Sequence, residues 1–131
     1  MSVMFGDSKK ERTRQVLRAL APYPAVFVPN QFGGWDVYFP NFPRAVVAGI
    51  NFVLARLAAV EALNDQVYQA FRDGGAPPAP SDPDGLPVDE EEVTGARVVM
   101  LEPDRDEILR RLGLHMVRPR VAVGGRKYVP R

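Results

Sequence analysis

The hydrophobic and polar positions of residues 23–49 follow the two-residue period of strands. In residues 35–39, Trp, Val and Phe alternate with Asp and Tyr, as in a strand with one buried face. The apolar runs 23–28 and 44–49 flank this segment across short turns that contain Gly-Gly and Pro-Asn-Phe-Pro. These three segments predict an antiparallel meander, with prolines at strand ends, where no ladder hydrogen bond is lost.

Two other segments, one before and one after the predicted strands, have the period of helices. Residues 9–20 place apolar side chains three and four positions apart, which predicts a short amphipathic helix. Ser8 and Glu11 before it match a capping box. Residues 52–72 predict a long helix, with Asn51 as its N-cap residue.

The long helix has one face of large apolar residues and one of alanines. We expect the large residues to pack on the sheet: Val53, Leu57, Val60, Val67 and Phe71. Asn64 lies in the middle of this stripe, where we expect it to bond to nearby backbone or to lie at the edge of the sheet, with a role in a site as the alternative. The other face carries four alanines: Ala55, Ala58, Ala59 and Ala62. Alanine has the highest helix propensity, so these residues either simply favour the helix or allow a second helix or a partner to approach closely.

The C-terminal third contains a connector, a strand and a short helix. Residues 76–95 are rich in Pro, Gly and acid, which predicts a connector without regular structure. Residues 97–101 predict a fourth strand, and a short helix follows with Asp104 as its cap and a Schellman ending at 113–114. The basic tail after it forms a small hairpin or stays mobile. The fold class is therefore α+β.

Composition narrows the class of protein. A chain of 131 residues with 46% hydrophobic residues and a net charge of +1 fits one globular domain. The sequence has no cysteine, no apolar segment long enough to span a membrane and no signal-peptide core at its start. We therefore expect a cytoplasmic protein.

Charge is divided along the chain, with an acidic middle between basic ends. Residues 61–107 carry 13 acidic and 3 basic side chains, and residues 111–131 carry 6 basic side chains and no acid. The cationic side chains of the tail could bind phosphates, so a nucleic-acid-associated protein is the alternative function. These residues are Arg118, Arg120, Arg126, Lys127 and Arg131. Internal charge complementarity explains the same pattern.

The sequence offers little catalytic chemistry. His115 is the only histidine and cysteine is absent, so a His/Cys metal site is excluded. No phosphate-binding or dinucleotide motif occurs. The carboxylates that could form a two-metal nuclease site are Asp36, Glu61 and Asp104, and the first predicted strand adds none. We expect neither enzymatic activity nor a metal or cofactor.

The order of these elements and several of their residues resemble the HicB-like antitoxin family. The resemblance covers residues 22–102. Its motifs are a Gly-Gly-Trp turn, a strand ending in Phe-Pro, a third strand ending in Gly, and a Pro-Pro-Ala-Pro-Ser loop after the helix. The residues that carry it are Tyr23, Ala25, Gly33, Gly34, Trp35, Val37, Phe39, Pro40, Pro43, Val47, Gly49, Ala58, Ala62, Gly75 and residues 77–81.

The resemblance implies a partial ribonuclease H-like fold, in which a further strand joins the edge of the meander. It also implies a non-catalytic antitoxin that masks a small RNA-cleaving toxin encoded next door. Residues 1–21 would then be a helical extension, 22–102 the HicB-like domain, and 103–131 a short helix and basic tail. The N-terminal helix is additional to the family pattern, and the C-terminus matches no DNA-binding module.

We expect a homo-oligomer that binds its partner at exposed sheet edges. Trp35, Tyr38 and Arg44 are the candidate partner-binding residues. An exposed edge strand invites pairing with another chain.

Overall fold

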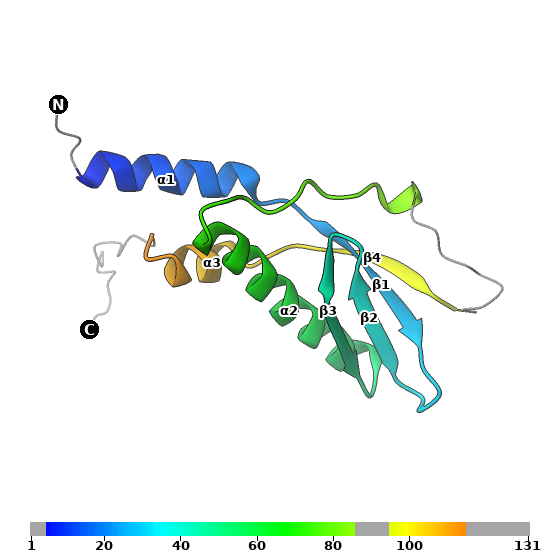
Figure 1. Ribbon diagram of the computed structural model, residues 1–131. Coiled ribbons are helices and arrows are strands. Elements are labelled where there is room, and N and C mark those ends of the chain that lie inside the picture. The colour runs from blue at the N-terminus through cyan, green and yellow to red at the C-terminus, as the bar shows by residue number, and fades with distance from the viewer. Residues whose placement is uncertain (1–4, 86–94, 115–131) are drawn as a thin grey trace, which may run out of the picture.

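A four-stranded antiparallel sheet organises the chain (Figure 1). The computed structural model describes residues 5–85 and 95–114. The strands β1 (Tyr23–Pro29), β2 (Trp35–Phe39) and β3 (Phe42–Gly49) form the predicted meander. The fourth strand, β4 (Arg97–Leu101), pairs with the free side of β1, so the order is β3-β2-β1-β4.

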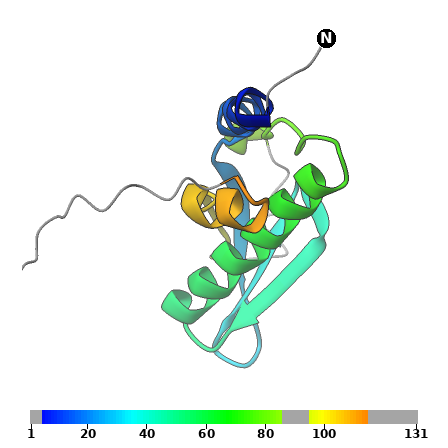
Figure 2. The same ribbon diagram turned by 90° about the vertical axis from the view of Figure 1, so that its left-hand side faces the viewer.

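Three helices complete the α+β fold that the sequence predicts. The long helix α2 (Phe52–Arg72) lies along one face of the sheet, and the short helix α3 (Arg105–Arg111) contacts α2. The first helix, α1 (Phe5–Ala19), lies at the end of the sheet where β1 begins (Figures 1 and 2). Among the described residues, no helix combines the length and apolar character needed to cross a bilayer.

The turn between β1 and β2 is built around Asn30. Its Oδ1 accepts hydrogen bonds from the backbone N–H groups of Phe32 and Gly34, each at 3.0 Å, and its Nδ2 donates to Asp36 at 3.1 Å. Gly33 has φ of 84°, a backbone conformation that favours glycine. One side chain and one glycine therefore fix the register of this hairpin.

The third strand begins two residues earlier than the sequence predicts. Phe42 already pairs with Phe39, and the register then shifts, so that Tyr38 pairs with Val46. The predicted four-residue turn is thus shorter, and the additional residues form an irregular segment inside β3. Phe42 is buried against the ring of Tyr23, with centroids 4.9 Å apart, which explains why the strand starts there.

The face of α2 that packs on the sheet differs from the prediction in its first half. Ala55 and Ala59 are fully buried, whereas Val53 and Leu57 are 66% and 58% exposed. Gly49 explains the difference: a Cβ at this position would lie 2.2 Å from the backbone nitrogen of Ala55. Because the helix backbone rests directly on the end of β3, only small residues fit between them. The second half follows the predicted stripe, since Val67 and Phe71 are buried.

Local caps account for where the later helices begin and end. Asn51 accepts the backbone N–H of Leu54 at 2.8 Å, and Asp104 accepts that of Glu107 at 3.1 Å, as predicted. The predicted Schellman ending of α3 is present, because Leu114 N–H donates to the carbonyl oxygen of Leu109 at 2.8 Å.

The predicted capping box at Ser8 is wrong. The first helix α1 already begins at Phe5, so Ser8 lies inside it and does not precede it. A serine is only mildly unfavourable inside a helix and does not stop it. Glu11 pairs instead with Arg14, at 3.2 Å.

The connector after α2 runs without regular structure up to the short 3₁₀ turn η1 (Pro83–Gly85), and two side chains of the sheet region hold it. The hydroxyl of Tyr23 donates to the carbonyl oxygen of Pro78. Asn41 donates to the carbonyl of Ala79 at 2.9 Å and accepts the N–H of Ser81 at 3.1 Å. The Pro-rich segment is therefore fixed against the fold at this point.

Candidate protein-binding surfaces

The three candidate partner-binding residues lie in different environments. Trp35 is half-buried on the helix side of the sheet, where its ring meets that of Phe52 at 5.3 Å and the Arg97 guanidinium at 5.6 Å. Tyr38 lies on the opposite, open face and is 39% exposed. Arg44 is exposed in the irregular segment of β3. The fold therefore does not gather them into one patch, and Trp35 is partly used in packing.

A different group of side chains forms a contiguous apolar surface at the start of α2. We call it the α2 apolar surface, made of Phe32, Ile50, Val53, Leu54 and Leu57. Phe32 and Ile50 are 85% and 79% exposed. Val53, Leu54 and Leu57 lie in the first two turns of α2, with Val53 and Leu57 four residues apart on one side. Ile50 and Phe32 line one shallow hollow of about 270 Å³ just before the helix.

The α2 apolar surface exists because small residues take the buried side of the helix. Large apolar side chains normally face the core of a two-layer fold. Here Gly49, Ala55 and Ala59 occupy the contact between the helix and β3, so the larger aliphatic residues of the same helical turns face outward. Contiguous exposed apolar residues of this kind typically mark sites of contact with another molecule.

The sequence contained a signal for this surface. Gly49 stands just before the helix, and Ala55 and Ala59 follow at helical spacing, which is typical of a close approach between a helix and a strand. The periodicity of the large residues alone favoured the wrong face. Phe32 and Ile50 lie in turns, and no period marks them.

The open face of the sheet is also unusually apolar. Along β2 and β3 its positions alternate with the buried ones, and Tyr38 and Val46 are exposed there, as is Met100 of β4. The central strand β1 differs, because it is buried on both faces over residues 23–27. Asp36 of β2 also lies on the open face by alternation. An antiparallel sheet with one solvated face normally carries polar residues at such positions.

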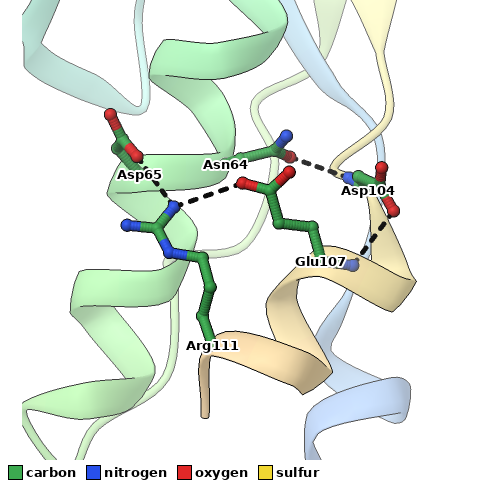
Figure 3. Close-up of polar contacts among 5 residues, drawn as sticks. All are labelled: Asn64, Asp65, Asp104, Glu107 and Arg111. Atoms are coloured by element: carbon green, nitrogen blue, oxygen red, sulfur yellow. Dashed lines mark hydrogen bonds and ion pairs between the residues drawn. The ribbon is translucent and has the colours of Figure 1, made fainter. Parts of the chain in front are cut away.

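The contact between α2 and α3 contains a group of five polar side chains joined by hydrogen bonds and ion pairs (Figure 3). Buried Asn64 accepts the backbone N–H of Asp104 at 2.7 Å, so the prediction that it bonds to backbone is confirmed. Arg111 bonds to Asp65 at 2.8 Å and lies 3.5 Å from Glu107. The hydrogen bond that Arg111 donates to Asp65 is the main reason that the pKa of Arg111 is raised.

This polar group positions α3 and offers no reactive centre. Each carboxylate is engaged: Asp65 and Glu107 with Arg111, and Asp104 with the first turn of α3. The guanidinium of Arg111 also lies over the ring of Tyr68, 4.3 Å from its centroid. We read the group as a clamp between two helices.

The carboxylates considered for a two-metal site do not converge. Asp36 bonds to Asn30 in the first hairpin, and Asp104 caps α3. Within residues 5–85 and 95–114, no three His, Cys, Asp or Glu side chains are grouped as a metal site requires. His115 and the candidate nucleic-acid-binding residues Arg118, Arg120, Arg126, Lys127 and Arg131 lie outside the described residues.

A second hollow, of about 410 Å³, lies between the end of α1 and the start of α3. Its lining combines apolar side chains such as Leu17 and Leu20 with the charged residues Glu102, Asp104 and Arg105. The Asp104 carboxylate is already bonded to Glu107 N–H. We therefore assign no ligand to this hollow.

Comparisons with known proteins support the fold. No family model matches the chain, and no curated protein matches it. Among the solved structures that are similar is a chain from a toxin–antitoxin complex of Streptococcus pneumoniae, with a TM-score of 0.59 and 23% sequence identity. The match covers 67% of this chain and 71% of that one. This chain therefore shares its fold with a component of a toxin–antitoxin complex.

Proposed function

We propose that the chain is a non-catalytic protein-binding module of a toxin–antitoxin system, in the manner of a HicB-type antitoxin. The observation that carries the proposal is the α2 apolar surface, since it leaves five large apolar side chains exposed on a fold that a toxin–antitoxin component shares. Its partner would be a small RNA-cleaving toxin encoded by the adjacent gene. The proposal includes no enzymatic step.

The composition of the α2 apolar surface suits a protein partner. Fully burying an aliphatic side chain contributes about 1.5–3 kcal/mol, and the exposed Ile50, Val53 and Leu57 supply several such contributions. Protein interfaces characteristically have an apolar centre with a polar rim. Arg56 and Glu61 on the same helix are exposed and can supply part of that rim.

Co-expression with the product of the adjacent small gene tests the proposal. The expected result is a complex that survives purification and suppresses the RNA cleavage of the partner. Replacing both Val53 and Leu57 with Glu should weaken binding at least 100-fold, because two charges would have to be desolvated in the interface.

Met100→Glu is the matched control, because Met100 is also an exposed apolar residue but lies on the open face of the sheet. It should bind like the wild-type chain. Absence of any complex with the neighbouring product would refute the antitoxin role. If the Val53→Glu/Leu57→Glu variant still forms the complex, the partner binds at a site other than the α2 apolar surface.

A further inference from the structure

The edge strand β3 lacks the devices that normally keep sheet edges from pairing. Within residues 5–85 and 95–114, its regular part, Ala45–Gly49, pairs on one side only, with β2, because the sheet order places β3 at the edge. This segment reads Ala-Val-Val-Ala-Gly, without a charge or a proline. Exposed edges are usually protected by charges, prolines or bulges, and here the irregular segment with Pro43 and Arg44 lies before the regular part.

Small residues on α2 lie above this edge. Phe52 packs against Phe27 of β1, at 4.7 Å between rings, and Ala55 lies against Gly49 of β3. Viewed down the helix axis, Phe52 faces β1, and Ala55 faces β3. Continuing around the axis in the same direction, Ala62 and then Ala58 come next, so both lie on the β3 side of the helix. Both are half-buried, and they stand four residues apart on one face.

A second copy of this chain fits such an edge. Two antiparallel β3 strands related by a two-fold axis perpendicular to the sheet would be about 4.8 Å apart and would place both α2 helices on the same face. The helix α2 lies beside β3 and contacts it more than any other strand (Figure 1). In such a dimer the two helices would therefore lie side by side. Helices pack 8–10 Å apart, and the closest approach requires small residues such as Ala58 and Ala62.

Symmetry also explains why this segment suits a copy of itself. Near a two-fold axis each residue faces its own counterpart or a close neighbour of it, so a charge there would face a like charge. The run Ala45–Gly49 has none. Val46, which is 65% exposed on the open face, would gain an apolar neighbour.

We propose that the chain self-associates through β3, forming an eight-stranded sheet across a two-fold axis with the two α2 helices side by side. The pairing segment adjoins the α2 apolar surface, since Ala48 and Gly49 line the same hollow as Phe32 and Ile50, but the inference does not depend on a toxin partner. A five-residue strand pair spans about 17 Å, and with the helix contact the interface is on the order of 400–600 Å² per copy. That is the low end for specific interfaces, so we expect a reversible dimer with a micromolar Kd.

Light scattering or sedimentation of the full chain, over concentrations from micromolar to about 1 mM, tests the proposal. The mass should rise with concentration from 14.5 kDa toward twice that value, 29 kDa. Val46→Lys should keep the chain monomeric by placing two ammonium groups beside the axis, and Ala58→Phe should do so by separating the helices. Val53→Lys, on the α2 apolar surface, is the control and should dimerise like the wild type.

Single cysteines give an independent measurement, because the chain has none of its own. Cysteines placed one at a time at Val46, Val47 and Ala48 should yield a disulfide-linked dimer most readily at the position closest to the axis, whereas Val53→Cys should not. A wild-type chain that stays at 14.5 kDa throughout the concentration series overturns the proposal. So does a dimer that persists in both Val46→Lys and Ala58→Phe, with folding of each variant verified by circular dichroism.

Discussion

At the scale of single residues, Asn64 joins two helices through one buried hydrogen bond. Its side chain is 4% exposed, and its Oδ1 accepts the N–H of Asp104, the residue that in turn caps α3. Removing one partner of a buried hydrogen bond leaves the other unsatisfied, which costs more than the bond itself contributes. The position of α3 therefore depends on an amide in the middle of an otherwise apolar stripe.

Asn64→Ala should lower the free energy of unfolding by about 1–3 kcal/mol, as measured by urea denaturation. Asp65→Ala is the neighbouring control: its ion pair with Arg111 is exposed and should contribute less than about 1 kcal/mol. Equal effects of the two substitutions would show that the buried hydrogen bond carries no special weight.

Tyr23 should make stability depend on pH above 10. Burial raises the pKa of Tyr23 above its usual value of 10.0, so the folded chain keeps the phenol proton at a pH where the unfolded chain has lost it. The stability that this residue contributes is therefore complete below pH 10 and falls as pH rises further, toward the folded pKa.

Tyr23→Phe isolates this effect. The variant loses the hydrogen bond to the carbonyl of Pro78, which costs about 1 kcal/mol at pH 8. Its stability should then decline less steeply than that of the wild type between pH 10 and 11, in denaturant titrations at each pH. Parallel declines would mean that the phenol of Tyr23 ionises equally easily in both states.

At the scale of elements, the orientation of α2 follows from one backbone contact. Gly49 lets the helix rest on the end of β3, and this contact selects alanines for the inner side of the first helical turns. The larger residues of those turns then become the α2 apolar surface. The same contact therefore determines both the packing of the layers and the candidate binding site.

Ala59→Leu should destabilise the fold by about 1–3 kcal/mol, because the added methylene groups have no space between helix and sheet. Leu57→Ala, two positions away, should change stability by less than about 0.5 kcal/mol, because its side chain is 58% exposed. Thermal and urea unfolding of both variants measures this. A larger loss for Leu57→Ala would place the large residues of α2 inside the fold.

Local patterns predicted most elements because the features that set them are local. The two-residue period and the turn residues located the hairpins, and Asn51 and Asp104 located helix starts. The period of the large residues could not decide the inner face of α2, because both faces are apolar and a contact with Gly49 decides between them. The small residues Gly49, Ala55 and Ala59 were the local signal for this contact. The candidate site was missed for the same reason, since exposure depends on which face the sheet covers.

At the scale of the whole molecule, α1 is held by few but buried contacts. Val16 is fully buried and belongs to the same core as Ile108 of α3. The Arg12 guanidinium donates to the carbonyl oxygen of Phe71 at 2.9 Å, at the end of α2. A helix with so polar a sequence gains little stability by itself, so it should form only together with the core that buries Val16.

The described part of the chain should therefore unfold as one unit. Trp35, the only tryptophan, reports on the sheet by fluorescence, and far-ultraviolet circular dichroism reports on the helices. The two transitions should coincide in urea. Val16→Ala should move both midpoints down together and lower the free energy of unfolding by about 2 kcal/mol. Val53→Ala, on the exposed side of α2, should change the free energy of unfolding from either signal by no more than about 0.5 kcal/mol. A helical signal that falls before the fluorescence changes, and that Val16→Ala shifts alone, would mean that α1 unfolds independently of the sheet.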